Sequence, residues 1–412
     1  MKSQRTIWFI NQYASTPETG IAGRHFYIAQ ELARIGHSVY VIAGSYSHIL
    51  RKEKEFSGPF YVENIEKNFS VVWIKLDKYK HAHSKKRIIN EFIFSKQLMK
   101  LPQIILDNPD VVIHSSPALI SYYGSKYLSS YYKVPYVFEV RDPWPLTLIE
   151  IGGYSKRHPF IMLLQWIEDR AYQEANYALS NFYNAVEHMT NRGMDPNKFS
   201  WIPNGLSLIE IEKTQPLPES IASKIPKDKY ILGYTGTLGE ANAMSYFIEA
   251  ASLLKSYSKI HFVIVGDGKL KNDLINKAKD LDNITFLDPI PKVQVQSMLN
   301  LFNACYIGWK DMPMYKLGIA ANKIPEYMFS AKPVIHSFSG KGDFISQARA
   351  GLTVKAEDPE AIAASILELY STSEIEQKAM GERGKDFVIN NLTYNKIARK
   401  LEEVLFSKEL IK

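Results

Sequence analysis

The stretch Asn322–Ile335, NKIPEYMFSAKPVI, decides the fold. Its first half has the pattern of a short helix, and the Lys-Pro-Val-Ile at its end opens an apolar strand, so a buried strand follows a helix directly. Lys323 and Glu326 are three residues apart and lie on one face of that helix. An ammonium and a carboxylate near a helix start can hold a nucleoside diphosphate, the first on phosphate and the second on ribose hydroxyls. An ordinary ion pair on a solvated helix face is the alternative.

The alternation of helix and strand continues on both sides of this stretch. Short runs of β-branched and aromatic residues alternate with helical patterns such as residues 24–36, RHFYIAQELARIG, where Gly36 ends the helix. Such alternation predicts parallel sheets in α/β layers. The predicted strands are 6–11, 38–44, 70–76, 110–116, 136–142, 177–181, 230–236, 261–268, 284–289, 303–309 and 333–338.

The length and one break in the pattern divide the chain. At 412 residues it is too long for one ordinary core. The alternation stops around Ile202–Leu208, and the Pro-dotted stretch 214–227 that follows is typical of a linker. We therefore expect two α/β domains at 1–204 and 205–391, with a last helix, about 392–412, that crosses back onto the first. Doubly wound sheets bind ligands outside the carboxyl ends of their strands, so a cleft between the halves is the expected active site.

The composition is that of a globular protein, with 46% hydrophobic and 23% charged residues. No apolar run reaches the roughly 18–20 residues that span a bilayer, and the first residues read as a buried strand. The single Cys305 cannot form an intramolecular disulfide, which fits a reducing cytoplasm. Cys305 lies in an apolar run, where we expect an inert core residue.

The net charge of +7 is concentrated in residues 51–100, which carry 12 Lys and Arg against six Asp and Glu. There Lys85, Lys86 and Arg87 stand beside an apolar and aromatic run. Basic residues next to an apolar face predict that the region Lys75–Lys100 meets anionic lipid headgroups. The alternative is a solvated helix that packs its apolar side on the first sheet. Nucleic acid is not an expected partner, because no recognition motif is present.

Three glycine-containing turns follow predicted strands. In the first, Thr19 and Gly20 precede a helix that starts near Arg24, and backbone N–H groups at such a turn favour phosphate or carboxylate. Arg24 can add a charged contact or cap local carboxylates. Many such turns bind nothing.

The other two turns lie in the second half. Gly236 and Thr237, in LGYTGTLGEAN, allow the backbone and a hydroxyl to approach a diphosphate. Gly266, Asp267 and Gly268, in VGDGKLKNDL, form a tight turn. For Asp267, an Asx-type bond within the turn is as reasonable as ligand contact.

These motifs resemble those of the family 4 glycosyltransferases over essentially the whole chain. NKIPEYMFSAKPVI is similar to the donor-binding signature SKxxEYMAxGKPVI, and the second and third turns resemble the YxGxxG and GDGPxxxxL segments. The resemblance implies the GT-B fold, α/β with two doubly wound Rossmann-like domains facing each other across a cleft. It also implies that the Gly20 loop faces the donor phosphates and the acceptor, and that Leu287–Pro291 holds the base.

The sequence departs from the family pattern at two places. The family signature has a first Glu eight positions before Glu326, on the transferred sugar, but Gly318 stands there. The backbone amides of Leu317, Gly318 and Ile319 are the groups we expect on the sugar instead. The cations that often follow the YxGxxG loop are also missing, so Lys323 is expected to do more of the diphosphate binding, together with Arg24.

The block EVRDPWP, Glu139–Pro145, closely resembles EVRDLWP of the WbuB-like amino-sugar transferases, which include N-acetyl-L-fucosamine transferases. Arg141 falls where many family 4 enzymes have a His near the reacting centre. Asp142 can orient an acceptor hydroxyl or take its proton, or the two residues can pair to brace the strand end. His114 ends another strand and is expected to point at the cleft, although a lone His there is more often structural.

The resemblance implies a retaining, metal-independent glycosyltransferase that moves an N-acetylated or deoxy amino sugar from UDP to a lipid-linked or polysaccharide acceptor in O-antigen or capsule assembly. We expect it on the inner face of the cytoplasmic membrane, with the UDP-sugar as co-substrate and no cofactor or metal. The Asp280–Asp282 motif is expected to be a solvated turn. Two alternatives are a UDP-sugar 2-epimerase, which needs further acid/base carboxylates, and a non-catalytic membrane-associated scaffold, which has no need of Lys323 and Glu326.

Overall fold

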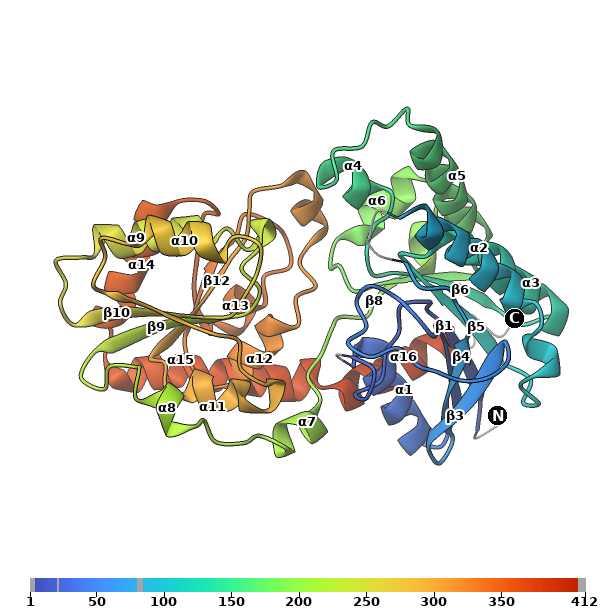
Figure 1. Cartoon of the computed structure of the whole chain (residues 1–412), viewed down its shortest axis with the longest axis horizontal. Helices are drawn as coiled ribbons and strands as arrows, with labels where there is room; N and C mark the ends of the chain where they lie inside the picture. The colour runs from blue at the N-terminus through green and yellow to red at the C-terminus, as the bar shows by residue number, and fades with distance from the viewer. Residues whose placement is uncertain (1–3, 21, 80–83, 407–412) are drawn as a thin grey trace. The chain divides into compact units, whose positions relative to one another are not determined.

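The computed structural model describes residues 4–20, 22–79 and 84–406. Residues 407–412 of the expected last helix therefore lie outside the described residues. The contacts of the chain form two compact units, one of Met1–Asn204 with Tyr394–Lys412 and one of Gly205–Thr393. In each unit, helices cover both faces of a mainly parallel sheet (Figure 1).

The sheet of the first unit has eight strands in the order β3-β4-β2-β1-β5-β6-β7-β8. All neighbours are parallel except β3 and β4, which form an antiparallel pair. The strands are β1 (Thr6–Ile10), β2 (Ser38–Gly44), β3 (Phe60–Glu66), β4 (Phe69–Ile74), β5 (Val111–Ser115), β6 (Tyr136–Val140), β7 (Tyr177–Ser180) and β8 (Phe199–Trp201).

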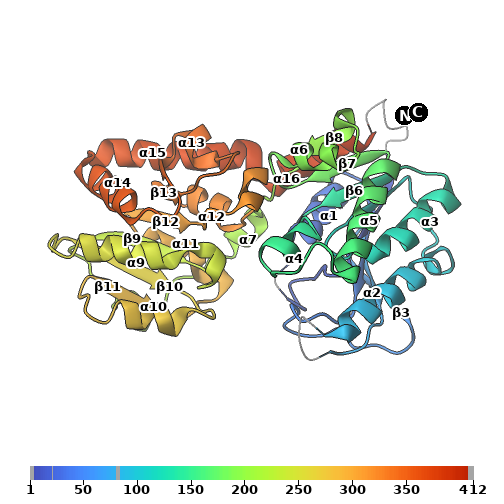
Figure 2. The ribbon, with the colours of Figure 1, turned by 90° about the horizontal axis from the view of Figure 1, so that it is seen from above.

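Successive residues of β1 face opposite sides of this sheet and enter two separate cores. Ile7 and Phe9 pack under α1 and α16, which lie side by side (Figures 1 and 2), whereas Trp8 and Ile10 pack under α2 and α3. The α-helices are α1 (Arg24–Arg34), α2 (Lys85–Leu98), α3 (Tyr122–Tyr132), α4 (Leu146–Glu150), α5 (Pro159–Glu174), α6 (Ala185–Asn191) and α16 (Tyr394–Phe406). Helix α1 ends just before Gly36, as predicted, because φ of +107° there favours glycine.

The sheet of the second unit has six parallel strands in the order β11-β10-β9-β12-β13-β14. They are β9 (Tyr230–Thr235), β10 (Ile260–Val265), β11 (Ile284–Leu287), β12 (Ala304–Gly308), β13 (Val334–Ser337) and β14 (Gly351–Val354). Helices α9, α10 and α14 pack on one face, and α11, α12 and α15 lie on the other (Figure 1). The α-helices are α7 (Leu208–Glu212), α8 (Glu219–Ala222), α9 (Met244–Leu253), α10 (Lys271–Lys277), α11 (Val295–Asn300), α12 (Lys323–Phe329), α13 (Phe344–Ala348), α14 (Pro359–Ser371) and α15 (Glu374–Phe387).

Every predicted strand range contains a strand, and the doubly wound α/β architecture of both halves is confirmed. The prediction missed β3, β8 and β14, each of which lies at the edge of its sheet. An edge strand buries less of its surface and carries more polar residues, as FYVENIE in β3 shows, so it lacks the apolar run that marks a central strand.

The strand orders locate the ligand-binding edge of each unit. In both sheets the order runs outward in opposite directions from a central pair, β1 and β5 in the first and β9 and β12 in the second. Such a switch point leaves a crevice at the carboxyl ends of the two strands, where doubly wound sheets bind ligands. The residues after β1, β5, β9 and β12 are therefore the first place to look for a site.

Candidate active site

Lys323 begins α12, the helix between β12 and β13, as the sequence predicted. Its Nζ donates to Tyr234 Oη and to Asn242 Oδ1, each at 2.8 Å, and lies 4.5 Å from the centre of the Tyr234 ring. Burial lowers the pKa of the ammonium to about 8, and the carboxylate of Glu326, one turn on, works in the opposite direction. Among the described residues, these two hydrogen bonds leave Lys323 one N–H for an anion.

The loop after β9 brings its backbone against this ammonium. Gly236 has φ of +153°, and a Cβ there would lie 3.0 Å from Lys323 Nζ. The loop after β10 supports it, because a Cβ on Gly266 would lie 1.9 Å from the carbonyl oxygen of Gly236. A Cβ on Gly268 would likewise lie 2.4 Å from the carbonyl oxygen of Leu238. Gly236 thus faces the cation, whereas Gly266 and Gly268 allow the two loops to pack together.

Thr237 and Asp267 lie on the exposed side of these loops. The carbonyl oxygen of Thr237 accepts from Tyr234 Oη at 2.7 Å, which fixes the phenol that holds Lys323. Asp267 Oδ1 accepts from the backbone N–H of Gly268 at 2.8 Å. This is the turn-forming alternative for Asp267, so the structure corrects the expectation of a donor contact by that oxygen.

Glu326 lies one turn after Lys323, and its carboxylate is already paired. Its Oε1 accepts from Lys292 Nζ, and its backbone carbonyl accepts from Gln296 Nε2 at 3.0 Å. Lys292 follows the Leu287–Pro291 loop directly, so one segment anchors both the side chain and the backbone of Glu326. Sequence reasoning missed Lys292, because 34 residues separate the partners. Its position just after the expected base loop was the available signal.

The loop expected to contact the sugar is a 3₁₀ turn, Pro313–Leu317, followed by Gly318. Gly318 has φ of +105°, a conformation that a Glu would adopt only with strain. Its N–H donates to the carbonyl oxygen of Tyr315 at 3.0 Å, so the structure corrects the expectation that this amide is available to a sugar. Leu317 and Ile319 are nearly buried.

In the first unit a buried polar chain joins the carboxyl ends of β1 and β6. Asn11 Oδ1 accepts from the N–H of Tyr13 at 2.9 Å, so its Nδ2 faces His25 Nδ1 at 3.0 Å as a donor. His25 Nε2 then carries the proton and donates to Glu139 Oε2 at 2.6 Å. Burial lowers the pKa of His25 to about 4 and keeps it neutral. Burial also opposes charge on Glu139, but Arg24 and His25 outweigh it and hold its pKa far below the usual range.

Arg24 belongs to this buried network, which corrects its expected role on the donor phosphates. Its Nη2 lies 2.9 Å from Glu139 Oε1, and its Nη1 donates to the carbonyl oxygens of Ile202 and Pro203 and to Asn204 Oδ1. The guanidinium therefore ties α1 to the chain segment after β8. The sequence analysis did not single out His25 or Glu139. His25 directly follows Arg24, and Glu139 is the first residue of the EVRDPWP block.

The turn at Thr19 and Gly20 is closed on itself, which corrects the expected phosphate loop. Both backbone N–H groups donate to the carbonyl oxygen of Thr16, at 3.1 and 3.0 Å. The hydroxyl of Thr19 accepts from the N–H of Thr16 at 3.0 Å. These groups brace the turn and do not point at a ligand.

Arg141 and Asp142 follow β6, but no ion pair joins them among the described contacts. Asp142 accepts from Trp144 Nε1 at 3.0 Å and from Thr147 Oγ1 at 2.5 Å, and burial raises its pKa. Arg141 Nε is buried without a hydrogen-bond partner among the described residues. Trp144 and Thr147 therefore brace the turn by their bonds to Asp142. The catalytic role of Arg141 and Asp142 stays a prediction.

His114 is a core residue, which corrects its expected catalytic role. It is completely buried, with Nδ1 3.0 Å from Tyr136 Oη and Nε2 2.9 Å from Ser121 Oγ. It also stacks on Phe138, and burial lowers its pKa to about 4. In a parallel strand buried on both faces, even a terminal side chain can point into the core.

Arg87 is separated from the other two cations of the predicted membrane surface. Its Nε donates to Tyr13 Oη at 2.9 Å, and its guanidinium lies 4.7 Å from the centre of the Trp144 ring. Arg87 is only partly exposed, and its role as a lipid contact stays a prediction. Lys85 and Lys86 are exposed at the start of α2, as are Ile89 and Phe92 further along the helix. Residues 80–83 of the predicted region lie outside the described residues.

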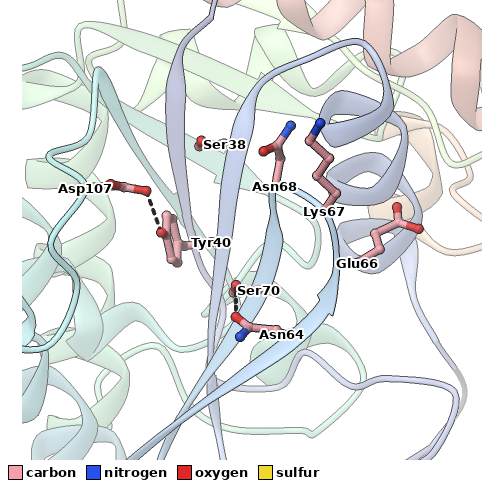
Figure 3. Close-up of a pocket in the computed structure, with 8 residues that line it drawn as sticks. All are labelled: Ser38, Tyr40, Asn64, Glu66, Lys67, Asn68, Ser70 and Asp107. Atoms are coloured by element: carbon pink, nitrogen blue, oxygen red, sulfur yellow. Dashed lines mark hydrogen bonds between the residues drawn. The ribbon is translucent and has the colours of Figure 1, made fainter.

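A hollow of about 460 Å³ in the first unit lies away from these groups (Figure 3). Its side chains come from the amino ends of β2 and β4 and from the β3–β4 turn, the edge opposite to the switch point. Tyr40 Oη donates to Asp107 Oδ2 there at 2.7 Å. The lining residues are Ser38, Tyr40, Asn64, Glu66, Lys67, Asn68, Ser70 and Asp107.

Across residues 4–20, 22–79 and 84–406, no three His, Cys, Asp or Glu side chains are grouped so that they could hold a metal ion. No helix within the same ranges is long and apolar enough to span a membrane. Cys305 is buried, as expected, and burial raises its pKa to about 12.

Both halves of the chain match family models of known proteins. A model described as Glycosyltransferase Family 4 matches residues 20–209, and one described as Glycosyl transferases group 1 matches residues 229–372. A curated relative, the UDP-Gal:alpha-D-GlcNAc-diphosphoundecaprenol alpha-1,3-galactosyltransferase of Escherichia coli, is 23% identical over 227 residues. That alignment spans 51% of this chain and 54% of the relative, about half of each.

Solved structures of similar fold cover nearly the whole chain. A sucrose-phosphate synthase from Thermosynechococcus elongatus superposes with a TM-score of 0.74 at 14% identity, covering 97% of this chain and 98% of its own. Anabaena HepE in complex with UDP and glucose has a TM-score of 0.66 at 11% identity, covering 98% of this chain and 100% of its own. Similarity at this identity shows the fold alone, and it confirms the predicted GT-B fold with two Rossmann-like domains.

Proposed function

We propose that this chain, which matches glycosyltransferase family models over residues 20–209 and 229–372 and has the GT-B fold, is an enzyme that transfers a sugar from a UDP-sugar to a lipid-linked or saccharide acceptor. The donor nucleotide is supported by two of the similar proteins, one named for UDP-Gal and one bound to UDP. The lipid-linked acceptor is supported by the diphosphoundecaprenol in the name of the E. coli relative.

The observation that carries the proposal is the environment of Lys323. Its ammonium lies against the Gly236 backbone at the switch point of the second sheet, held by two neutral oxygen acceptors. A half-buried cation without a carboxylate in direct contact attracts an anion, and a diphosphate is the anion that suits a glycine loop. Glu326 stands one turn away to accept the ribose hydroxyls.

The Lys323 cation can stabilise a departing diphosphate without a metal ion, so the proposed reaction is metal-independent. The family resemblance further supports retention, in which the new bond forms on the face from which UDP leaves. The transferred sugar is an N-acetylated or deoxy amino sugar, as the EVRDPWP block suggests. Arg141 and Asp142 are the proposed acceptor-side groups, because both stand at the carboxyl end of β6.

The acceptor is proposed to reach the enzyme at the inner face of the cytoplasmic membrane, in the assembly of an O-antigen or capsule. Support comes from α2, where the exposed Lys85 and Lys86 stand near the exposed Ile89 and Phe92. Cations beside apolar side chains suit a surface of anionic lipid.

The test is acceptor-dependent release of UDP. The purified chain is incubated with a set of UDP-sugars, with and without lipid extract from bacterial membranes. Release of UDP only in the presence of extract supports transfer. Conversion of the UDP-sugar without extract would identify a 2-epimerase instead. Absence of both UDP release and UDP binding would overturn the proposal and favour a scaffold.

A further inference from the structure

Trp309 occupies a central position in the second unit that the proposed function does not yet use. It follows β12 directly and so stands at the switch point. Its ring centre lies 5.8 Å from Lys323 Nζ and 5.8 Å from the ring centre of Tyr315. Tyr315 belongs to the Pro313–Leu317 turn. Trp309 therefore contacts both the donor cation and the loop beside it.

The buried His336, backed by the partly buried Asp343, holds the indole. Trp309 Nε1 donates to His336 Nε2 at 3.0 Å, and since an indole N–H can only donate, that imidazole nitrogen must be unprotonated. The ring proton then lies on Nδ1 and is donated to Asp343 Oδ1 at 2.8 Å. Asp343 is fixed in turn by the N–H of Ile345 at 3.0 Å and by Ser346 Oγ at 2.6 Å. Only one protonation pattern of His336 satisfies this chain.

The rings of Trp309 and Tyr234 both lie close to the Lys323 ammonium. The ring centres lie 5.8 and 4.5 Å from Lys323 Nζ, within the range of attraction between a cation and a ring face. The other groups that face the ammonium are neutral Asn242 and, one turn away, Glu326, which is paired with Lys292. Both rings displace water from the ammonium and so contribute to the burial that lowers its pKa.

We propose that Trp309 is a positioning residue for the donor cation. Held by His336 and Asp343, its indole keeps the Lys323 ammonium against the Gly236 loop and excludes water from it. This inference rests on the proposed binding of the donor diphosphate by Lys323. It concerns a side chain that need not touch the substrate itself.

The experiment measures UDP binding by calorimetry between pH 6.5 and 10, because UDP binding requires neither the sugar nor the acceptor to be known. The diphosphate binds the protonated amine, so wild-type affinity should be full at low pH and fall as the pH rises through about 8, the pKa of Lys323. In Trp309→Ala, water reaches the amine and its pKa moves toward the ordinary 10.5. Affinity near neutral pH should drop, and the remaining affinity should be lost only at higher pH.

Three further variants test the chain of hydrogen bonds from Trp309 through His336 to Asp343. Trp309→Phe removes the indole hydrogen bond, and His336→Ala removes that bond together with the one to Asp343, so UDP affinity at pH 7 should fall about 3- to 10-fold in each. His336→Gln should restore it, because the amide oxygen reaches the place of Nε2 and accepts from the indole. The matched control is Trp201→Phe in the first unit, which removes a comparable bond from Trp201 Nε1 to the carbonyl oxygen of Asn181 at 3.2 Å. It should leave UDP affinity unchanged.

Wild-type affinity and pH dependence in both Trp309→Ala and His336→Ala would overturn the positioning role, as would an equal loss in Trp201→Phe. If wild-type protein fails to bind UDP, the proposed function fails, and exchange of the Trp309 indole N–H decides the inference. That proton, identified by its absence in Trp309→Phe, should exchange slowly in wild type and quickly in His336→Ala. Equal exchange rates of the indole N–H in wild type and in His336→Ala would refute the hydrogen bond from Trp309 to His336.

Discussion

At the scale of single residues, two charged side chains have different kinds of partner. Lys323 is held by neutral oxygens only, whereas Glu139 is enclosed by Arg24 and His25 with both carboxylate oxygens paired. A charge that lacks a direct counter-charge is available to a ligand, and one that is fully paired holds the fold together. The first kind marks a binding site and the second a structural network.

Replacing Lys323 or Glu326 by Ala should abolish most transfer and leave the fold intact. Each change removes one charge-assisted contact to the donor, which costs about 1.5–3 kcal/mol, or roughly a 10- to 150-fold loss of rate. Steady-state kinetics with the UDP-sugar measures the loss. Lys277→Ala, which ends an exposed ion pair with Glu249, is the control and should behave as wild type. Near-normal rates in either site variant would place the donor elsewhere.

Glu139→Gln should destabilise the first unit strongly. The change leaves the buried Arg24 without its carboxylate, and removing one partner of a buried pair costs about 3–5 kcal/mol. Because Arg24 and His25 lower the pKa of Glu139, its contribution to stability is present above the ordinary Glu pKa of about 4.3 and declines as the pH falls below it. The difference between wild type and variant should therefore shrink in acid.

Urea unfolding at pH 7 and at pH 3 measures this difference. The control is Glu376→Gln, which breaks an exposed pair with Arg383 at 2.9 Å and should cost about 0–1 kcal/mol. Equal effects of the two substitutions at pH 7 would show that the buried network does not stabilise the unit.

At the scale of elements, α2 has one face packed against its unit and one face exposed. Glu91, Phe94 and Leu98 are buried against the unit, and Arg87 reaches Tyr13 and Trp144. The opposite face carries exposed lysines and apolar side chains. The packed-helix alternative therefore describes the buried face of α2, and the lipid contact stays a prediction for its exposed face.

Lys85→Glu combined with Lys86→Glu should release the protein from anionic vesicles. Each cation near such a surface contributes about 1 kcal/mol, and the reversal also adds repulsion. Co-sedimentation with phosphatidylglycerol vesicles measures binding, which should weaken with salt because the Debye length is about 8 Å at physiological ionic strength. The control reverses Lys224 and Lys227, two exposed lysines of the second unit. Unchanged sedimentation of the α2 variant would end the membrane interpretation.

At the scale of the whole molecule, two sheets of the same winding carry different groups at their switch points. The second unit presents a cation and glycine loops, and the first presents a closed turn, a buried charge network and the strand-end pair Arg141 and Asp142. The proposed donor binding therefore belongs to the second unit, and the proposed acceptor activation to the first. A reaction divided in this way needs only positioning and charge stabilisation.

Transfer should survive EDTA, because Lys323 supplies the charge stabilisation that a metal ion would otherwise provide. Acceptor-dependent UDP release is measured before and after chelation, with the protein first dialysed against the chelator. Loss of activity that added Mg²⁺ or Mn²⁺ restores would contradict the metal-free mechanism.

The sequence alone determined the elements and the local constellations. Alternating apolar runs predicted every central strand, and helical spacing brought Lys323 and Glu326 onto one face of α12, because both properties depend on neighbours within a few residues. Three of the four edge strands, β3, β8 and β14, escaped prediction because an edge buries little surface and leaves a weak pattern. The Gly236 loop could also be predicted, because a glycine-containing turn after a strand depends on neighbours within a few residues.

Only the tertiary structure decided which side chains meet. Arg24 was expected on a phosphate and His114 in a cleft, but strand pairing and helix packing brought the first to Glu139, 115 positions away, and the second into the core. The bond from Trp309 to His336 arises in the same way, through the pairing of β12 with β13. Periodicity reports which face of an element is buried, whereas hydrogen-bond partners depend on the register and packing of elements far apart in the chain.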